Sequence, residues 1–277
     1  MFPGSNALMK PVFVTLCLAL AACDPLPPLP ADAQNFSAAP QRAAAARREV
    51  QFFCDFERSP TDCGFFEQSK VPGRATLVDV ARSGRHAVRL HTEPGDDHVN
   101  GSDDWDRNDL ALTHQATDCF EGHEAWWAHS VLFPDDFVPA PGGATIMDFH
   151  HTGSGGNANF HFNAFGMNLR LHGFGGSASN PQEYRVELGP LKRNAWYDLV
   201  YHLRWSSGQD GFMQAWMNGR KVLTHRGPTL YRGMQCYLKL ANYHSPTTPS
   251  SVIHDRIVRG TSASAVSLTP LEGVSEP

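Results

Sequence analysis

Two neighbouring segments of the sequence carry side chains that could form a polar binding site. They are Ile146–His151 and Asn159–Asn163. Because alternate side chains of a β-strand point to opposite faces, each segment as a strand would have one apolar and one polar face. Carboxyl, imidazole and amide groups together are unusual on an ordinary half-buried strand, so they predict a polar binding cleft. Five residues could share this surface: Asp148, His150, Asn159, His161 and Asn163.

In two further predicted strands, the same alternation places charged or proton-transferring side chains together on one face. Arg107 and Asp109 share one face of a predicted strand, and Lys239 and Tyr243, four residues apart, share one face of another. Alternation places His151 on the face opposite the polar cluster, which favours a structural role for it. A strand histidine is in general more often a hydrogen-bonded structural residue than a catalyst.

The elements that must position these residues are short strands. From Gln51 onward, stretches rich in Val, Phe, Trp and Tyr alternate with Gly, Pro, Asn and Asp turns, with almost no helical periodicity. This pattern predicts an all-β sandwich or barrel. Gly208–Gly211 and Asn218-Gly219 are hairpin signals. We predict one domain over residues 51–262, followed by a disordered tail at 263–277.

The N-terminal sequence predicts export. Residues 1–22 have the pattern of a signal peptide, in which Lys10 precedes an apolar run too short to span a bilayer. The run ends in Leu-Ala-Ala-Cys, which resembles the bacterial lipoprotein cleavage box and would make Cys23 the lipidated N-terminus. Asp24 then resembles an inner-membrane retention signal, so we expect a periplasm-facing envelope lipoprotein. Plain secretion is the alternative. The Pro/Ala-rich residues 23–50 would form a tether.

Four cysteines remain after cleavage of the signal peptide: Cys54, Cys63, Cys119 and Cys236. An even number in an oxidising compartment predicts disulfides, although four cysteines allow three pairings. The short separation favours Cys54–Cys63, which leaves Cys119–Cys236. Four buried thiols are the alternative. No Cys/His spacing typical of zinc occurs.

The charge of the chain limits its partners. With 23 Lys and Arg against 28 Asp and Glu, the net charge is −5, and it becomes −6 once Lys10 is removed with the signal peptide. A mildly acidic protein is a poor partner for nucleic acid. A polyanionic ligand would need a locally basic cleft.

Several segments, in order along the chain, resemble the heparin lyase I-like polysaccharide lyases, which are related to glucuronan and alginate lyases. The resemblance implies a concanavalin-like β-jelly-roll sandwich of two antiparallel sheets. Three residues depart from the family pattern: Asp109 stands where Glu is usual, Asp148 where Gln is usual, and Ala241 where Gly is usual. The segments are Arg107–Leu110, Asp148–His150, Trp196–Ser206, Asp210-Gly211, Trp216–Gly219, Lys239–Tyr243 and Asp255–Gly260.

The resemblance implies β-elimination on a uronic-acid polysaccharide. That reaction needs a group that neutralises the sugar carboxylate, a base for the C5 proton and an acid for the departing O4. His150 and Tyr243 are the expected proton-transfer pair, with Tyr243 as the acid and a candidate base. Arg107, with Asn159 or Asn163, would stabilise the carboxylate. The expected substrate-binding residues are Lys239, Asn159, His161, Asn163 and Asp148, of which Asp148 fits least because its charge would repel an anionic sugar.

No cofactor is required by this chemistry, although Ca²⁺ is a possible ligand of an acidic loop. Residues 93–109 contain seven carboxylates that lack the ordered spacing of an EF-hand, so a solvated loop over the cleft is favoured. Trp105 in this loop, with Trp126 and Trp127, could stack on sugar rings or fill the core. The expected partner is an anionic polysaccharide, bound by a monomer whose only membrane contact is the lipid anchor.

Two other functions remain open at this point. A non-catalytic, envelope-anchored glycan-binding sandwich would need aromatic and polar groups but no proton relay. A jelly-roll glycoside hydrolase would need paired carboxylates, and the sequence has no Glu-x-Asp-x-x-Glu strand motif.

Overall fold

The fold of the chain was analysed in a computed structural model. The structure describes residues 49–96, 105–140, 142–244 and 248–274. The chain divides into two compact units, residues 1–41 and 42–277, and the description below concerns the second. The predicted signal peptide, Cys23 and most of the tether therefore lie outside the described residues. No helix in the described part of the chain is long and apolar enough to cross a membrane.

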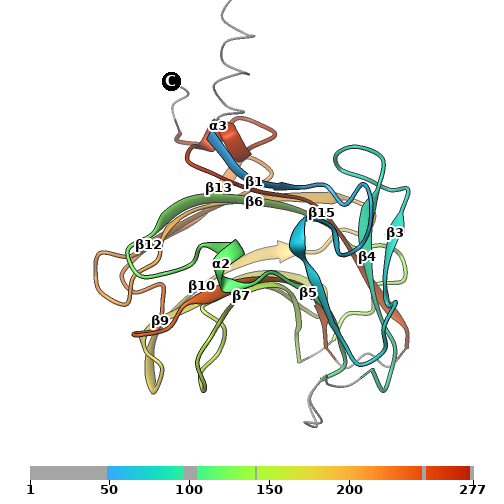
Figure 1. The fold of residues 1–277 in the computed structure, drawn as a ribbon, viewed down its shortest axis with the longest axis horizontal. Helices are drawn as coiled ribbons and strands as arrows, with labels where there is room; N and C mark the ends of the chain where they lie inside the picture. The colour runs from blue at the N-terminus through green and yellow to red at the C-terminus, as the bar shows by residue number, and fades with distance from the viewer. Residues whose placement is uncertain (1–48, 97–104, 141, 245–247, 275–277) are drawn as a thin grey trace, which may run out of the picture. The chain divides into compact units, whose positions relative to one another are not determined.

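Two antiparallel sheets form the layers of a sandwich (Figure 1). The first sheet has eight strands, and β1 (Val50–Cys54) pairs with its strand β15. The other seven strands follow one another in the order β13 (Arg220–Arg226), β12 (Phe212–Met217), β11 (Trp196–Arg204), β6 (Glu124–Leu132), β15 (Ser250–Gly260), β4 (Ala87–Thr92) and β3 (Ala75–Val78).

The second sheet has seven strands and carries all the segments predicted to form the site. Only three short helical turns accompany the two sheets in the described residues: η1 (Asp62–Gly64), α2 (His114–Thr117) and α3 (Ala263–Val266). The order of the second sheet is β10 (Asn180–Pro190), β9 (Asn168–Ser177), β8 (Phe160–Phe165), β7 (Ala144–His151), β14 (Cys236–Tyr243), β5 (Arg107–Ala111) and β2 (Phe66–Ser69). The predicted sandwich of two antiparallel sheets is confirmed.

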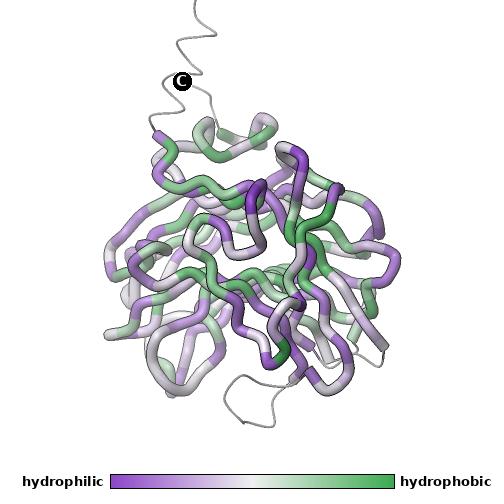
Figure 2. Tube along the Cα trace, turned by 45° about the vertical axis from the view of Figure 1, so that its right-hand side comes forward, coloured by the Kyte–Doolittle hydropathy of each residue, from purple (hydrophilic) through white to green (hydrophobic). Residues whose placement is uncertain are grey.

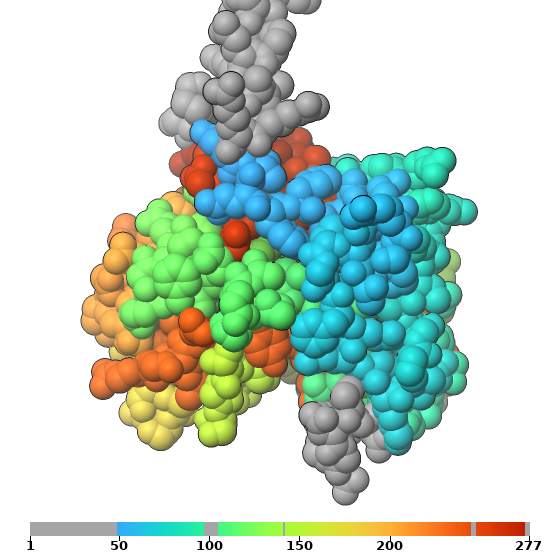
Figure 3. All heavy atoms as spheres, viewed as in Figure 1, coloured from blue at the N-terminus to red at the C-terminus, as the bar shows by residue number. Residues whose placement is uncertain are grey.

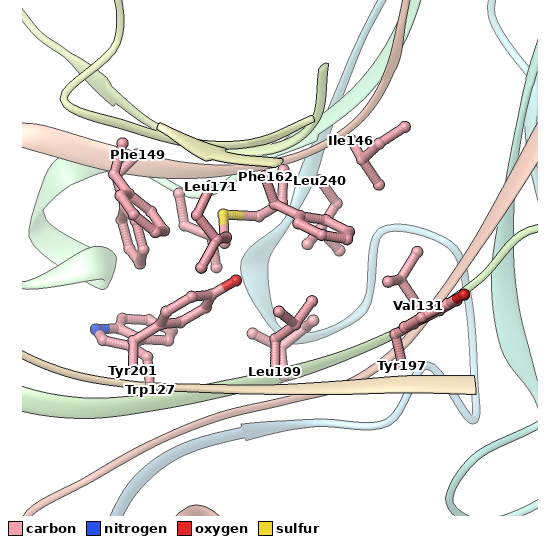
Figure 4. Packing of buried hydrophobic residues seen from close by; sticks show 14 of the residues in the cluster. Trp127, Val131, Ile146, Phe149, Phe162, Leu171, Tyr197, Leu199, Tyr201 and Leu240 are labelled. Atoms are coloured by element: carbon pink, nitrogen blue, oxygen red, sulfur yellow. The ribbon is translucent and has the colours of Figure 1, made fainter. Parts of the chain in front are cut away.

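The core fills the space between the two sheets, and it explains the alternation in the sequence. Phe149, Phe162 and Leu171 point inward from the seven-stranded sheet toward Trp127 and Tyr201 on the opposite layer (Figure 4). Along the chain, apolar and polar positions alternate through much of the fold (Figure 2). Since the inward faces are apolar, the polar residues between them must lie on the outer faces.

The two disulfides have the pairing that the sequence favours. Cys54 joins Cys63, nine residues away, and Cys119 joins Cys236, 117 residues away. Cys236 is the first residue of β14, so the second disulfide ties the start of that strand to the segment after α2.

The C-terminal segment differs from the predicted disordered tail. Residues 263–274 form α3 and a turn, and Val266 and Leu271 are buried against Trp216 of β12. The indole nitrogen of Trp216 also donates a hydrogen bond of 2.9 Å to the backbone carbonyl of Glu272. The apolar residues of this Ser/Pro-rich segment therefore pack against the sheet. The blue β1 lies beside the red C-terminal residues in Figure 3, as the β1–β15 pairing requires.

Candidate active site

The strand register of the seven-stranded sheet places the predicted residues in rows on its outer face. In one row His172, His161, Asp148 and Lys239 lie opposite one another on β9, β8, β7 and β14. A second row crosses the same sheet, from β9 to β5, and contains Arg170, Asn163, Thr145, Tyr243 and Arg107. The register therefore gathers, on one surface, residues that are up to 136 positions apart in the sequence.

A cleft of about 380 Å³ opens over this surface. Three residues that the sequence predicted for the site, His161, Asn163 and Tyr243, line it. Trp105 lines it as well, which favours the sugar-contact alternative for this residue over a place in the core. The other lining residues are Gly142, Gly143, Ala144, Thr145, Asn157, Phe165, His172 and Phe174.

Tyr243 lies between a cation and an indole ring. The guanidinium carbon of Arg107 is 4.0 Å from the centre of the Tyr243 ring, and the ring of Trp105 is 5.7 Å away and tilted by 52°. Tyr243 ends β14 and Arg107 begins β5, directly opposite it in register. The phenol therefore reaches the cleft with a positive charge against its ring.

A buried ion pair lies beside this tyrosine. The Lys239 ammonium is 2.7 Å from Asp109 Oδ2, and the same oxygen is 3.5 Å from the Arg107 guanidinium. Lys239 and Asp109 are almost fully buried. Desolvation lowers the pKa of Lys239, but the attraction of nearby carboxylates, chiefly its contact partner Asp109, outweighs it, so the pKa is raised and the lysine stays protonated.

Asp148 is a buried carboxyl group on the same face. It lies opposite His161 on one side and Lys239 on the other, and only 3% of its surface is exposed. Its Oδ1 has no hydrogen-bond partner among the described residues. Burial raises the pKa of Asp148, although the nearby Lys239 and His150 act in the opposite direction.

The histidines that line the cleft are neutral. Burial lowers the pKa of His161 to about 3, and the neighbouring His172, His150 and Lys239 lower it further. Burial also lowers the pKa of His172, whose Nε2 lies 2.9 Å from Glu183 Oε1. Both imidazoles can therefore donate or accept hydrogen bonds to a ligand without adding positive charge.

His150 does not line this cleft. Its Nδ1 lies 3.0 Å from the backbone carbonyl of His151, and its ring is 5.5 Å from that of Tyr237, its partner in register. Tyr243 lies opposite Thr145 instead, five positions along β7, which is a separation of about 16 Å between the two backbone positions. The structure therefore does not bring His150 and Tyr243 together as a proton-transfer pair.

Asn159 is also away from the lining of the cleft. It is fully buried, and its amide nitrogen donates a hydrogen bond of 3.3 Å to the Phe174 carbonyl. His151 is buried as well, with Nδ1 3.1 Å from the Gly153 carbonyl, in agreement with its predicted structural role.

Several lining residues were not identified from the sequence. Strand register, which no local sequence motif predicts, brings four of them to the cleft: Thr145, Phe165, His172 and Phe174. Arg170 lies at the far side of the cleft, with its guanidinium carbon 4.1 Å from the centre of the Phe165 ring. The outward alternation on β9 was the only signal that could have found His172 and Phe174.

The acidic segment is partly occupied by internal ion pairs. Arg74 lies 2.8 Å from Glu93 and 2.9 Å from Asp96. Asp97, Asp103 and Asp104 lie outside the described residues. Within the described ranges, no group of three or more His, Cys, Asp and Glu side chains could hold a metal ion.

The fold is similar to that of lyases and of a sugar-binding domain in solved structures. One is endo-β-1,4-glucuronan lyase from the fungus Trichoderma reesei, with a TM-score of 0.64, 16% identity, and coverage of 78% of this chain and 98% of that chain. The alginate lyase AlgAT5 of polysaccharide lyase family 7 gives a TM-score of 0.49, 14% identity, and coverage of 69% and 84%.

The third similar structure is the ligand-binding domain of botulinum neurotoxin serotype D in complex with N-acetylneuraminic acid. Its TM-score is 0.52 at 10% identity, and the match covers 81% of this chain and 50% of that chain. At these identities the similarities to the glucuronan lyase and to the neurotoxin domain show a shared fold alone, so they do not separate a lyase from a binding domain.

The family match distinguishes between a lyase and a binding domain. The family model for polysaccharide lyases matches residues 64–258, which is most of the described domain, so the chain belongs to the polysaccharide lyase family. No curated protein matches the sequence. The protein is a polysaccharide lyase.

Proposed function

We propose that this lyase cleaves a uronic-acid-containing polysaccharide by β-elimination, as the resemblance to heparin lyase I-like enzymes implies. The observation that carries the proposal is the position of Tyr243, which enters the cleft with the Arg107 guanidinium 4.0 Å from its ring centre. Elimination next to a uronate requires a proton-transfer group beside a positive charge, and this pair supplies both.

Tyr243 serves as base and acid in the proposed reaction. A neighbouring cation favours the ionised form of a phenol, so Arg107 assists the phenolate that removes the C5 proton. The resulting phenol then donates its proton to the departing O4. One side chain can perform both transfers when the proton and the leaving group lie on the same side of the sugar ring. This assignment needs no contact between Tyr243 and His150.

The sugar carboxylate is bound by the second row of the sheet. Asn163 lines the cleft two strands from Tyr243, and its Oδ1 has no hydrogen-bond partner among the described residues. The amide nitrogen of Asn163 and the neutral His161 can donate hydrogen bonds to the carboxylate and to the enolate-like intermediate. Lys239 and Arg107 contribute positive charge, and Trp105 and Phe174 offer ring faces to the sugars.

Tyr243→Phe is the direct test. The soluble domain is incubated with glucuronan, alginate and heparin-like polysaccharides, and the absorbance of the new C4–C5 double bond is followed. The wild type should give this absorbance with at least one polymer, and Tyr243→Phe should lose about 10²–10⁴-fold in rate while it still binds the polymer. No absorbance with any polymer, across pH and with Ca²⁺ added, would contradict the proposed substrate class.

Tyr237→Phe is the matched control. Tyr237 belongs to the same strand and the same face, but it contacts His150 and does not line the cleft. We expect this variant to retain most of the activity. If Tyr237→Phe and His150→Asn abolish the reaction while Tyr243→Phe does not, the reacting centre lies around His150 instead.

We also propose that the enzyme is attached to the bacterial envelope through a lipid on Cys23. The support is the sequence alone: a short apolar run followed by Leu-Ala-Ala-Cys and a Pro/Ala-rich stretch. Labelled fatty acid should be incorporated into the wild type and not into Cys23→Ser. A secreted, unlabelled wild type would show plain export.

A further inference from the structure

Four ionisable residues lie behind the lining of the cleft, where Arg107 contacts the ring of Tyr243 and Asp148 is paired in register with His161. Arg107 and Lys239 are cations, and Asp109 and Asp148 are carboxyl groups. If all four were ionised, their charges would cancel, and a uronate would enter a cleft with no net attraction for it. The protonation of one of the two aspartates therefore decides whether the cleft favours an anion.

The two aspartates have different surroundings. Asp109 has a cation in direct contact, the Lys239 ammonium at 2.7 Å, with Arg107 at 3.5 Å on the same oxygen. Asp148 forms no ion pair in the described part of the chain, and this is what separates the two aspartates, because buried oxygens of both lack a hydrogen-bond partner there. An ionised carboxylate that is buried without a contact partner is unfavourable, and such a group usually keeps its proton.

We propose that Asp148 is protonated when the enzyme binds its substrate, so that this group of four residues carries one net positive charge next to the cleft and favours one uronate carboxylate there. This inference rests on the proposed uronic-acid substrate. Asp148 thereby acts as a specificity-determining residue that does not react. Protonation removes the charge that made Asp148 fit poorly where Gln is usual, because a neutral carboxyl group resembles a side-chain amide.

The groups that face Asp148 support this assignment. On β14 these are Lys239 and Tyr237, on β8 and β9 the neutral His161 and His172, on β5 the Arg107–Asp109 pair, and on β7 itself His150. Burial is the largest influence and raises the pKa of Asp148, and Asp109 raises it further, against the opposing effects of Lys239, His150 and Arg107. A bound uronate would add a second negative charge nearby and favour the proton still more.

The consequence is a loss of substrate affinity at alkaline pH. When Asp148 ionises, the net positive charge disappears and the anionic sugar is no longer favoured. A methyl-esterified uronate has no charge, so its binding should not change. The effect must be measured as binding and not as turnover, so that it does not depend on the proton transfers of the reaction.

The experiment uses the inactive Tyr243→Phe variant and tetrasaccharides of glucuronic and mannuronic acid. In a titration from pH 6 upward, we expect the Kd of the better ligand to rise about tenfold or more as Asp148 ionises, the effect of one added charge near the bound carboxylate. In Tyr243→Phe/Asp148→Asn the Kd should stay nearly constant over this range. The methyl ester should show no pH dependence with either protein. An undiminished rise of the Kd in Tyr243→Phe/Asp148→Asn would overturn the proposal.

Two control variants test which group causes the pH dependence of the Kd. Tyr243→Phe/His150→Asn should keep the rise in Kd, because His150 and Tyr237 are the partly exposed titratable groups beside Asp148. Tyr243→Phe/Tyr237→Phe should also keep the rise, because Tyr237 is not the group proposed to ionise. If His150→Asn removes the pH dependence, the histidine and not Asp148 controls binding.

An infrared difference spectrum tests the protonation independently of any ligand. At neutral pH, wild type minus Asp148→Asn should show the C=O band of a carboxylic acid. The two bands of a carboxylate in its place would overturn the proposal even if uronates bind. If no tetrasaccharide binds at any pH, the proposed substrate fails, and the acid band still decides the state of Asp148.

Discussion

The guanidinium carbon of Arg107 lies 4.0 Å from the centre of the Tyr243 ring, and the two residues face each other across β5 and β14. The contact joins two segments of the predicted site that are far apart in the sequence, Arg107–Leu110 and Lys239–Tyr243. It fixes the phenol at one wall of the cleft and holds a positive charge against it.

Arg107→Ala should therefore reduce kcat/KM strongly. The substitution removes a charge that stabilises both the phenolate and the developing enolate, and such electrostatic groups contribute about 10²–10³-fold. Arg107→Lys should recover part of the loss, because it keeps the charge without the planar stacking group. Steady-state kinetics on the polymer that the panel identifies provide the measurement.

Arg170→Ala is the comparison for this experiment. Arg170 also stacks on a lining ring, Phe165, but it is paired with Glu187 at 2.6 Å and lies on the far side of the cleft. We expect Arg170→Ala to raise KM by less than about tenfold, because a partly exposed ion pair contributes little free energy. Equal losses of kcat in both variants would show that Arg107 has no special relation to the reacting centre.

Alternation in the sequence was sufficient to place the polar face, because side chains on a strand have a period of two. Asp148, His161, Asn163, Lys239 and Tyr243 all lie on the outer face of one sheet, as the sequence predicts. The apolar residues between them form the core.

Register between strands was not predictable from the same pattern. Strict alternation puts Ile146 on the face of Asp148, but both Ile146 and Met147 are buried in the core, and the β7–β8 register shifts between Thr145 and Met147. The bulge depends on the neighbouring strands. Pairing also sets His150 opposite Tyr237, which separates it from the tyrosine that resemblance assigned as its partner.

The Lys239–Asp109 pair gives a prediction on stability. Both side chains are almost fully buried, so removing one leaves the other without its closest charge partner. Lys239→Met and Asp109→Asn should each lower the free energy of unfolding by about 3–5 kcal/mol. The double variant should lose clearly less than the sum of the two. Urea denaturation followed by circular dichroism measures this, and strictly additive losses would show that the two residues are not coupled.

Buried histidines away from the cleft predict sensitivity to acid. Burial lowers the pKa of His129 well below its usual value and that of His244 and His254 to about 4. In the unfolded chain these groups bind protons near pH 6.5, so the folded state loses stability as the pH falls from about 6.5 to 4, by roughly 1.4 kcal/mol per pH unit for each group. Above pH 6.5 their contribution is constant.

His129→Phe isolates one of these groups. Both ring nitrogens of His129 lack a partner among the described residues, and its ring packs on Tyr201 and Phe162, so a phenyl ring can take its place. Between pH 6.5 and 4 the free energy of unfolding should depend less steeply on pH in the variant. The decrease in slope should correspond to about one bound proton. Burial raises the pKa of Asp255 to about 6, so its contribution to the pH dependence of stability has the opposite sign to that of the histidines. This contribution is the same in both proteins and cancels in the comparison. An unchanged slope would mean that His129 is already charged in the folded state.

The two disulfides should contribute unequally to stability. Cys119–Cys236 closes a loop with a sequence separation of 117, and Cys54–Cys63 one of nine. Because the entropy removed from the unfolded chain increases with loop length, loss of the longer link should cost more, about 4–5 kcal/mol against about 2–3 kcal/mol. Thermal unfolding of the two double Cys→Ser variants compares them.

The longer disulfide should also influence activity through β14. Cys236 begins the strand that carries Lys239 and ends at Tyr243, and Leu238 of that strand donates its backbone N–H to Thr117, two residues before Cys119. Below its lowered melting temperature, Cys119→Ser/Cys236→Ser should keep the KM of the wild type but lose kcat severalfold, because Tyr243 is held less firmly against Arg107. Cys54→Ser/Cys63→Ser should keep both constants, since neither residue belongs to β14. Equal kinetics in all three folded proteins would show that the pairing of β14 with β5 and β7 is sufficient to position the tyrosine.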